Sequence, residues 1–136
     1  MYSKLALSLE DAKLIAQAAN SLAETEGWPV AIAVVDDGAQ LLYFERRDGT
    51  KLGSIETAIA KARSAVLFAR PTKALEEIIA SGRTAMLRLP QAMPIQGGLP
   101  VEVDGEMIGA IGVSGVLSPQ DEAVAHAGIT RFAELK

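Results

Sequence analysis

The sequence predicts an α/β (α+β) domain of three layers, in which helices cover both faces of one antiparallel sheet. Two pairs of apolar segments are each joined by a tight turn, Asp36-Asp37-Gly38 in the first pair and Asp104-Gly105 in the second. Such turns between apolar segments are typical of β-hairpins. Helical periodicity precedes, separates and follows the two hairpins, so helices are available to both faces of the sheet they form.

The first elements are a helix and a hairpin. A helix is expected over residues 9–26, where Ser8 can cap its start and Gly27 can end it. Residues 30–35 are all apolar, which favours a central strand. Residues 41–46 are expected to return as its antiparallel partner.

The middle of the chain is expected to form a long helix and a short one. The long helix starts near Lys51 and stops at Pro71, since a proline ring breaks helical hydrogen bonding. Thr72 can cap the short helix, which runs through Ile79. Alanines form a ridge along the long helix, and this predicts that it lies very close to the sheet. The ridge consists of Ala58, Ala62, Ala65 and Ala69.

Residues 83–96 are expected to form a loop. Pro90 and Pro94 prevent a regular element there, so that only a short strand over residues 86–89 has room to form.

The second hairpin lies in a segment, residues 97–115, that carries six of the twelve glycines of the chain. Its two-residue turn predicts that Val103 pairs with Glu106 and Val101 with Ile108. Beyond the turn, the strand has no polar face, which is typical of the middle of a sheet. Its glycines predict a close neighbour, whether a packed helix, another subunit or a flat ligand.

The last helix is expected to start at Ser118 and to run to about Leu135. A capping serine followed by proline and an acidic residue is a strong helix start. The expected core face places His126 at its boundary. That face consists of Ala125, Ile129 and Phe132.

Composition favours one oligomeric domain over residues 1–136, since no linker divides the chain. Hydrophobic residues make up 49% of the chain but aromatic residues only 4%, and the mean hydropathy of +0.22 is high enough to predict a buried subunit interface. The net charge of −4 argues against nucleic acid as a partner. No apolar segment is long enough for a membrane span or a signal peptide, and we therefore expect a cytoplasmic protein without cysteine chemistry.

Several residues could carry function, each beside a simpler interpretation. Lys61 interrupts the alanine-rich helix and could reach a ligand, although extension of its stem to solvent is favoured. Gly97-Gly98 could form a backbone nest that binds an anion, or it could form only a tight turn, and the sequence favours neither interpretation. Ser114 lacks the glycine that a nucleophile elbow needs two residues later, where Val116 stands, so a structural role is favoured over a triad with the single histidine, His126.

Seven segments spread over most of the chain together form a recognisable set. They are AIAVVDDGAQLL (31–42), RRDG (46–49), AIAKA (58–62), FARPT (68–72), GGLPV (97–101), DGEMIGAIGVSG (104–115) and QDEAVAHAG (120–128). This set resembles the GlcG/HbpS-like (DUF336) family, which includes haem-binding HbpS and the C-terminal domain of the PduO adenosyltransferase. Arg47 and Ser64 depart from the residues common in the family, and His126 lies at a variable position.

This resemblance implies a profilin-like fold and assembly into dimers or larger rings. For some members it implies binding of haem or a related tetrapyrrole, whereas others are known chiefly from catabolic operons. Because His126 lies at a variable position, the resemblance does not assign it as a haem ligand. It is nevertheless the only imidazole of the chain.

Two functions follow from the residues and the resemblance. The first is a non-enzymatic oligomeric binding module for a small molecule, with haem as a candidate, in which Arg46, Lys61 and the Gly97-Gly98 turn receive carboxylates. The alternative is an enzyme of small organic acid catabolism, of the tautomerase or isomerase kind. Lys61, Asp36 or His126 would then move protons beside the glycine pair.

Overall fold

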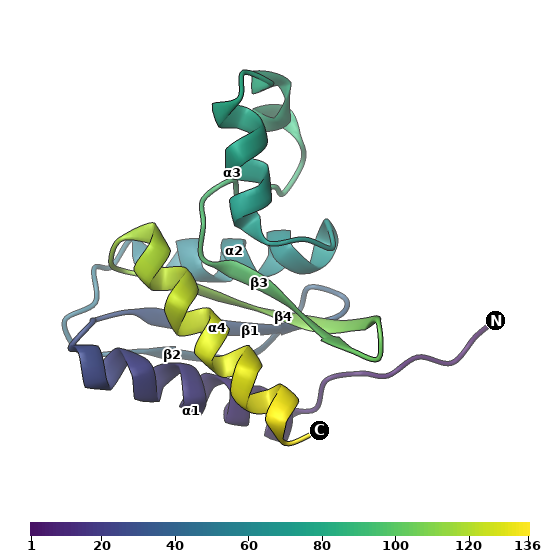
Figure 1. Ribbon diagram of the computed structural model, residues 1–136, viewed down its shortest axis with the longest axis vertical. Coiled ribbons are helices and arrows are strands. Elements are labelled where there is room, and N and C mark those ends of the chain that lie inside the picture. Colours follow the sequence, from purple (N-terminus) through teal and green to yellow (C-terminus); the bar gives the residue numbers. More distant parts are fainter.

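The structure is a computed structural model that describes all 136 residues. A four-stranded antiparallel sheet of order β2-β1-β4-β3 lies between α2 on one face and the pair α1 and α4 on the other (Figure 1). The three-layer α+β fold predicted from the sequence is therefore confirmed. In chain order the elements are α1 (Leu9–Glu26), β1 (Ala31–Asp36), β2 (Leu41–Arg46), α2 (Ser54–Leu67), α3 (Thr72–Ala80), the 3-10 helix η1 (Thr84–Arg88), β3 (Gly98–Val103), β4 (Glu106–Ser114) and α4 (Ser118–Glu134).

The sheet separates two apolar clusters. The larger one packs α1 and α4 against the sheet, with Ile15, Ile111 and Phe132 among its buried side chains. The smaller one lies under α2 and is built mainly from alanine, including Ala58 and Ala62. Small side chains let α2 approach the sheet closely, as the ridge predicts for Ala58, Ala62 and Ala65. Ala69, the fourth alanine of the predicted ridge, lies beyond the end of α2 and is exposed.

β4 lies in the middle of the sheet, between β1 and β3, and its glycines fit against neighbouring backbone. A Cβ added to Gly112 would lie 2.1 Å from Ala58 O and 2.5 Å from Ala62 N of α2. The close neighbour that these glycines predict is therefore a packed helix at this position.

The register of the second hairpin differs by one residue from the prediction. Val103 pairs with Glu106 as expected, but Val101 pairs with Gly109 instead of Ile108. A β-bulge at Ile108 causes the shift, because it places two residues of β4 opposite one of β3. Ile108 thereby joins the larger cluster, whereas Met107 packs against the smaller one.

Residues 84–88 form a short 3-10 helix within the segment expected to be a loop, and the short strand for which residues 86–89 leave room does not form. Two expected helix caps are wrong. Thr72 lies inside α3 and does not cap it, since its hydroxyl accepts a hydrogen bond from Gly98 N. Ser118 likewise makes no capping bond, and the side chain of Gln120 instead accepts a hydrogen bond from Leu117 N.

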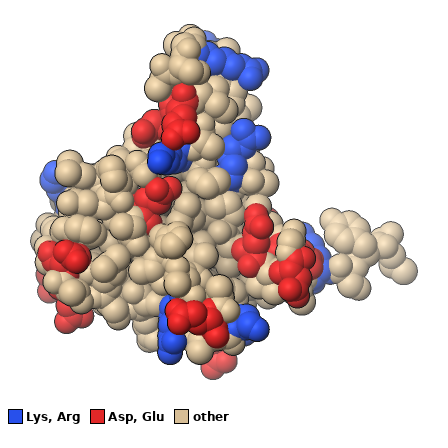
Figure 2. Space-filling view, in the orientation of Figure 1, with Lys and Arg blue, Asp and Glu red and all other residues tan.

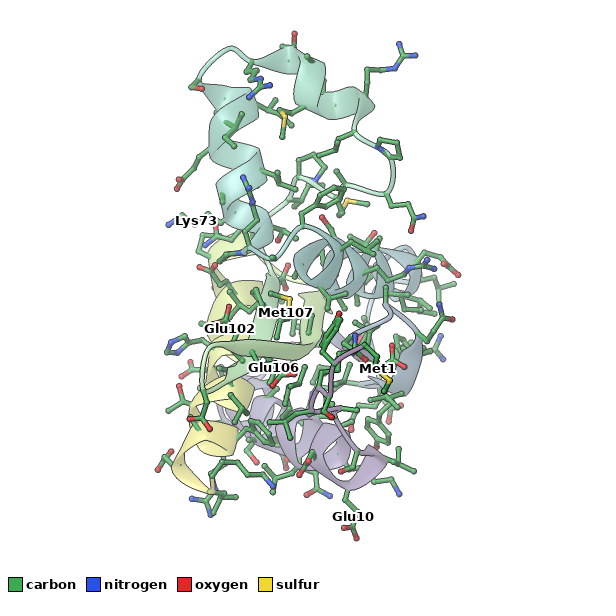
Figure 3. All side chains as sticks on the ribbon, turned by 90° about the vertical axis from the view of Figure 1, so that its right-hand side faces the viewer. Met1, Glu10, Lys73, Glu102, Glu106 and Met107 are labelled. Atoms are coloured by element: carbon green, nitrogen blue, oxygen red, sulfur yellow. The ribbon has the colours of Figure 1, made fainter.

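Two segments project from the three layers. The α3 arm, defined here as residues 72–95, stands above α2, and the N-terminal segment extends to the right of the view (Figure 1). Leu5 N donates to Glu106 Oε1 (2.9 Å) and so fastens the N-terminal segment to the β3–β4 hairpin, where Figure 3 labels Glu106 and Met107. None of the helices combines the length and the apolar character that crossing a bilayer requires.

Candidate functional site

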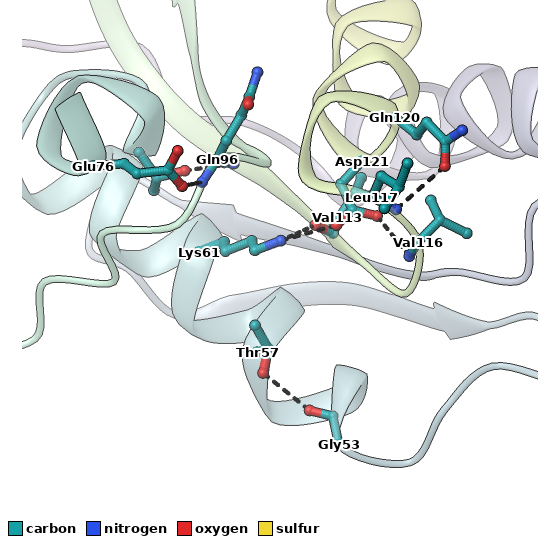
Figure 4. A network of polar contacts seen from close by, with 12 residues as sticks. Gly53, Thr57, Lys61, Glu76, Gln96, Val113, Val116, Leu117, Gln120 and Asp121 are labelled. Carbon is teal, nitrogen blue, oxygen red and sulfur yellow. Dashed lines mark hydrogen bonds and ion pairs between the residues drawn. The ribbon is translucent and has the colours of Figure 1, made fainter. Parts of the chain in front are cut away.

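Lys61 is the largest fully buried side chain of the protein, with 1% of its surface exposed. Its Nζ donates to Val113 O (2.9 Å) and to Asp121 Oδ2 (3.1 Å), as Figure 4 shows. The favoured expectation that this side chain extends to solvent is therefore wrong. Because α2 packs so closely on β4, the stem of Lys61 passes the end of β4 and reaches α4.

Asp121 uses both of its carboxylate oxygens within the protein. Oδ2 accepts from Lys61, and Oδ1 accepts from Val116 N (3.1 Å). Burial raises the pKa of Asp121, while the positive charge of Lys61 and the Val116 N–H act in the opposite direction. The ion pair joins α2, on one face of the sheet, to the first turn of α4, on the other.

Gly97 and Gly98 pack directly on Lys61. A Cβ at Gly97 would lie 2.7 Å from Lys61 Nζ, and one at Gly98 would lie 2.4 Å from Lys61 O. The N–H of Gly98 donates to Thr72 Oγ1 (2.9 Å). In this structure the Gly98 donor thus serves an internal contact and not an anion.

An open hollow of about 410 Å³ lies between β3 and the beginning of α4. His126 lies on its rim, with an exposed side chain whose Nδ1 is 3.3 Å from Thr130 Oγ1. No other hydrogen bond engages the imidazole, so its Nε2 is free. The residues lining the hollow are Leu99, Pro119, Glu122, Ala123 and His126.

A buried glutamine connects this hollow to the α3 arm. Gln96 donates through its side-chain Nε2 to Glu122 Oε2 (2.6 Å) and through its backbone N to Glu76 Oε1 (3.0 Å). The contact with Glu76 is drawn in Figure 4. In Figure 3, Lys73 marks the base of the same arm, above the β3–β4 hairpin. The base of α3 and one wall of the hollow are thereby held together.

The other predicted site residues lie apart from His126. Asp36 Oδ1 accepts from Gly38 N (2.9 Å) and Gln40 N (2.8 Å), so this carboxylate stabilises the β1–β2 turn. Arg46 is exposed at the end of β2. Ser114 is buried at the end of β4, and the strand pairing places β1 between it and Arg46.

Of the predicted site residues, the structure therefore brings Lys61, Gly97 and Gly98 together. Figure 2 shows small separate groups of either sign and a largely uncharged surface on the face in view.

Sequence reasoning missed most of the hollow. Its walls come from β3 and from α4, and the sequence alone does not show that Leu99 and Ala123 line the same hollow. One signal was present, because Glu122 and His126 are four residues apart and so share a helix face.

A four-stranded antiparallel sheet between one helix and a helix pair defines this chain as a three-layer domain of the profilin-like kind. The sequence profile of a family described as "Haem degrading protein HbpS-like" matches residues 7–130. The chain belongs to this HbpS-like family.

Individual relatives agree with this assignment. Protein GlcG of Escherichia coli (strain K12) is 42% identical over 114 residues, which are 84% of this chain and 85% of that protein. The crystal structure of Klebsiella pneumoniae ORFY, described as a DUF336 protein, superposes with a TM-score of 0.92 at 28% identity and covers 99% of this chain and 97% of its own. The crystal structure of a PduOC:haem complex superposes with a TM-score of 0.87 at 28% identity, covering 93% of this chain and 95% of its own.

Proposed function

We propose that this protein binds haem or a related tetrapyrrole in the His126 hollow, as an oligomeric binding module accessory to a catabolic or redox pathway. The observation that carries the proposal is that the only imidazole of the chain lies, with its Nε2 free, on the rim of this hollow. The haem complex of PduOC, a structural neighbour, supports the choice of ligand class.

The residues of the hollow fit a tetrapyrrole in two respects. A histidine that ligates a metal commonly engages its other ring nitrogen in a hydrogen bond, which orients the ring. Thr130 Oγ1 lies at hydrogen-bonding distance from Nδ1 and can accept a hydrogen bond from the Nδ1–H tautomer, which leaves Nε2 for iron. Leu99, Pro119 and Ala123 offer apolar surface for a flat macrocycle.

Size and openness shape the expected binding mode. The volume of about 410 Å³ falls within the roughly 300–1,000 Å³ typical of small-molecule sites. An open hollow covers only part of a tetrapyrrole, so a second subunit would complete the enclosure. Bound haem would supply redox-active iron, while His126 would ligate it and Thr130 would fix the imidazole.

The geometry does not favour the alternative of proton-transfer catalysis. Lys61 is sealed beneath Gly97 and paired with Asp121, and Asp36 is engaged in the β1–β2 turn. His126 lies on a helix that packs on the opposite face of the sheet from α2. A general acid and a general base need to reach the same bound substrate.

A haemin titration tests the proposal. We expect a saturable shift of the Soret band with the unaltered protein, and its loss or displacement in His126→Ala. Arg131→Ala, another exposed side chain of α4 that lies outside the hollow, is the matched control and should titrate as the unaltered protein does.

Two results would contradict the proposal. Absence of a saturable shift in the unaltered protein would refute haem binding. A shift that persists unchanged in His126→Ala would refute ligation by this residue and would direct attention to Tyr2, Tyr43, a methionine or a hydroxyl.

A further inference from the structure

Both walls of the His126 hollow are anchored to one side chain that does not line it. One wall is the beginning of α4, with Pro119, Glu122 and Ala123, and the other is Leu99 of β3. Lys61 lies on α2 and lines no part of the hollow.

The α4 wall is anchored through Asp121. The Lys61 ammonium forms an ion pair with Asp121 Oδ2 at 3.1 Å. The side chain of Lys61 is 1% exposed and that of Asp121 is 3% exposed. Asp121 also accepts from Val116 N, which fixes the turn between β4 and α4 (Figure 4). Because Glu122 directly follows Asp121, a displacement of the Asp121 carboxylate also displaces the α4 wall.

The β3 wall is anchored by contact. Gly97 and Gly98 leave no room for a Cβ beside Lys61 Nζ and Lys61 O, respectively. Leu99 directly follows this pair. The Lys61 side chain therefore packs, at Gly97, against the segment that leads into Leu99.

We propose that Lys61 is a positioning residue that sets the geometry of the hollow by holding the α4 wall through Asp121 and the β3 wall through Gly97 and Gly98. Its relevance to tetrapyrrole binding rests on the proposed function, whereas its effect on the hollow does not. An apolar side chain of similar volume could fill the same space but could not hold the Asp121 carboxylate, since it offers no charge-assisted hydrogen bond.

The test removes both charges together, so that neither is left buried without its partner. In ligand-free Lys61→Met/Asp121→Asn, the NMR signals of the Leu99 methyl groups and the His126 ring should shift from their unaltered positions. At the same time the dissociation constant for haemin should rise by about tenfold or more, as is typical when a supporting partner of a metal ligand is lost.

A second ion pair provides the control. Lys136 and Asp11 form a bridge of 3.3 Å that joins the C-terminal residue to α1. Lys136→Met/Asp11→Asn also removes one cation and one carboxylate, and it should leave the Leu99 and His126 signals and the haemin affinity unchanged.

The outcomes separate this inference from the proposed function. If the unaltered protein binds no haemin, the proposed function fails, and the ligand-free NMR shifts alone decide the role of Lys61. A folded double variant with unchanged Leu99 and His126 signals and unchanged haemin affinity would overturn the inference.

A single substitution, which leaves Val113 O as an acceptor for the Lys61 ammonium, covers the case in which the double variant does not fold. Asp121→Asn alone keeps an oxygen for Val116 N and presents an amide N–H₂ group to Lys61 in place of the second oxygen. It should move the same NMR signals in the same direction. Unchanged signals in folded Asp121→Asn would likewise overturn the inference.

Discussion

At the scale of single residues, the closest packing in the protein occurs where glycine meets the backbone of a helix. Gly112 of β4 lies under α2, and the atoms nearest to an added Cβ are backbone atoms of Ala58 and Ala62. Backbone atoms cannot rotate away as the end of a long side chain can. Even one methyl group at this position must therefore displace α2 from the sheet.

We expect Gly112→Ala to lower the free energy of unfolding by about 1–3 kcal/mol or more, and Gly112→Val to prevent folding. Chemical denaturation followed by circular dichroism measures the change. Gly53→Ala is the matched control, because an added Cβ there meets nothing within 4 Å. An unaltered denaturation midpoint in Gly112→Ala would show that α2 is more loosely packed than the structure indicates.

A pH-dependent contact fastens the N-terminal segment. A hydrogen bond and the positive charge of Lys4 lower the pKa of Asp37. Because the folded pKa lies below the unfolded value of about 3.9, this contact stabilises the fold above that value. The stabilisation is lost as the pH falls through the lowered pKa.

NMR titration of the Asp37 carboxyl group checks this expectation. In Lys4→Met the pKa of Asp37 should rise toward its usual range. Lys73→Met removes a lysine whose bridge to Glu77 lies within α3, and it should have no effect on Asp37. An Asp37 pKa that stays equally low in Lys4→Met would assign the lowering to the backbone donors of the turn.

At the scale of elements, sequence reasoning succeeded where local chemistry decides and failed where tertiary contacts do. The helix over residues 9–26 was predictable because Ser8 caps it and Gly27 ends it with a φ of 73°. The bulge at Ile108 was not, because the turn alone predicts an uninterrupted ladder. Thr72 resembled a cap by sequence, yet its hydroxyl accepts from Gly98, 26 residues away.

The candidate site shows the same division. Composition alone makes His126 the only imidazole that could ligate haem, because the chain has a single histidine. The burial of Lys61 was not predictable, since its partner Asp121 is 60 residues distant and belongs to a helix on the other face of the sheet. An alanine-rich face around a lysine indicates close packing, but it does not show which acidic residue pairs with the lysine.

At the scale of the whole molecule, the chain exposes more surface than its mass requires. A folded monomer of 14.3 kDa is expected to expose about 6,800 Å², and this chain exposes 7287 Å². The α3 arm and the N-terminal segment project from the body and account for part of the excess (Figure 1). Large aliphatic side chains are at least 41% exposed at nine positions besides the first two residues. They are Leu5, Leu9, Leu41, Leu52, Leu67, Leu87, Ile95, Leu117 and Leu135.

We therefore expect a stable oligomer of two or more subunits, because association would remove aliphatic surface from water. A specific interface buries about 800 Å² on each partner, which the projecting segments and exposed leucines can supply. Light scattering at micromolar concentration should give a mass of at least twice 14.3 kDa. Leu87→Glu, at the far part of the α3 arm and 60% exposed, should shift the mass toward the monomer, whereas Lys51→Glu, a charge change at an exposed polar position, should not. A monomeric mass for the unaltered protein would contradict the expectation, and an oligomer that Leu87→Glu leaves intact would exclude the arm from its interface.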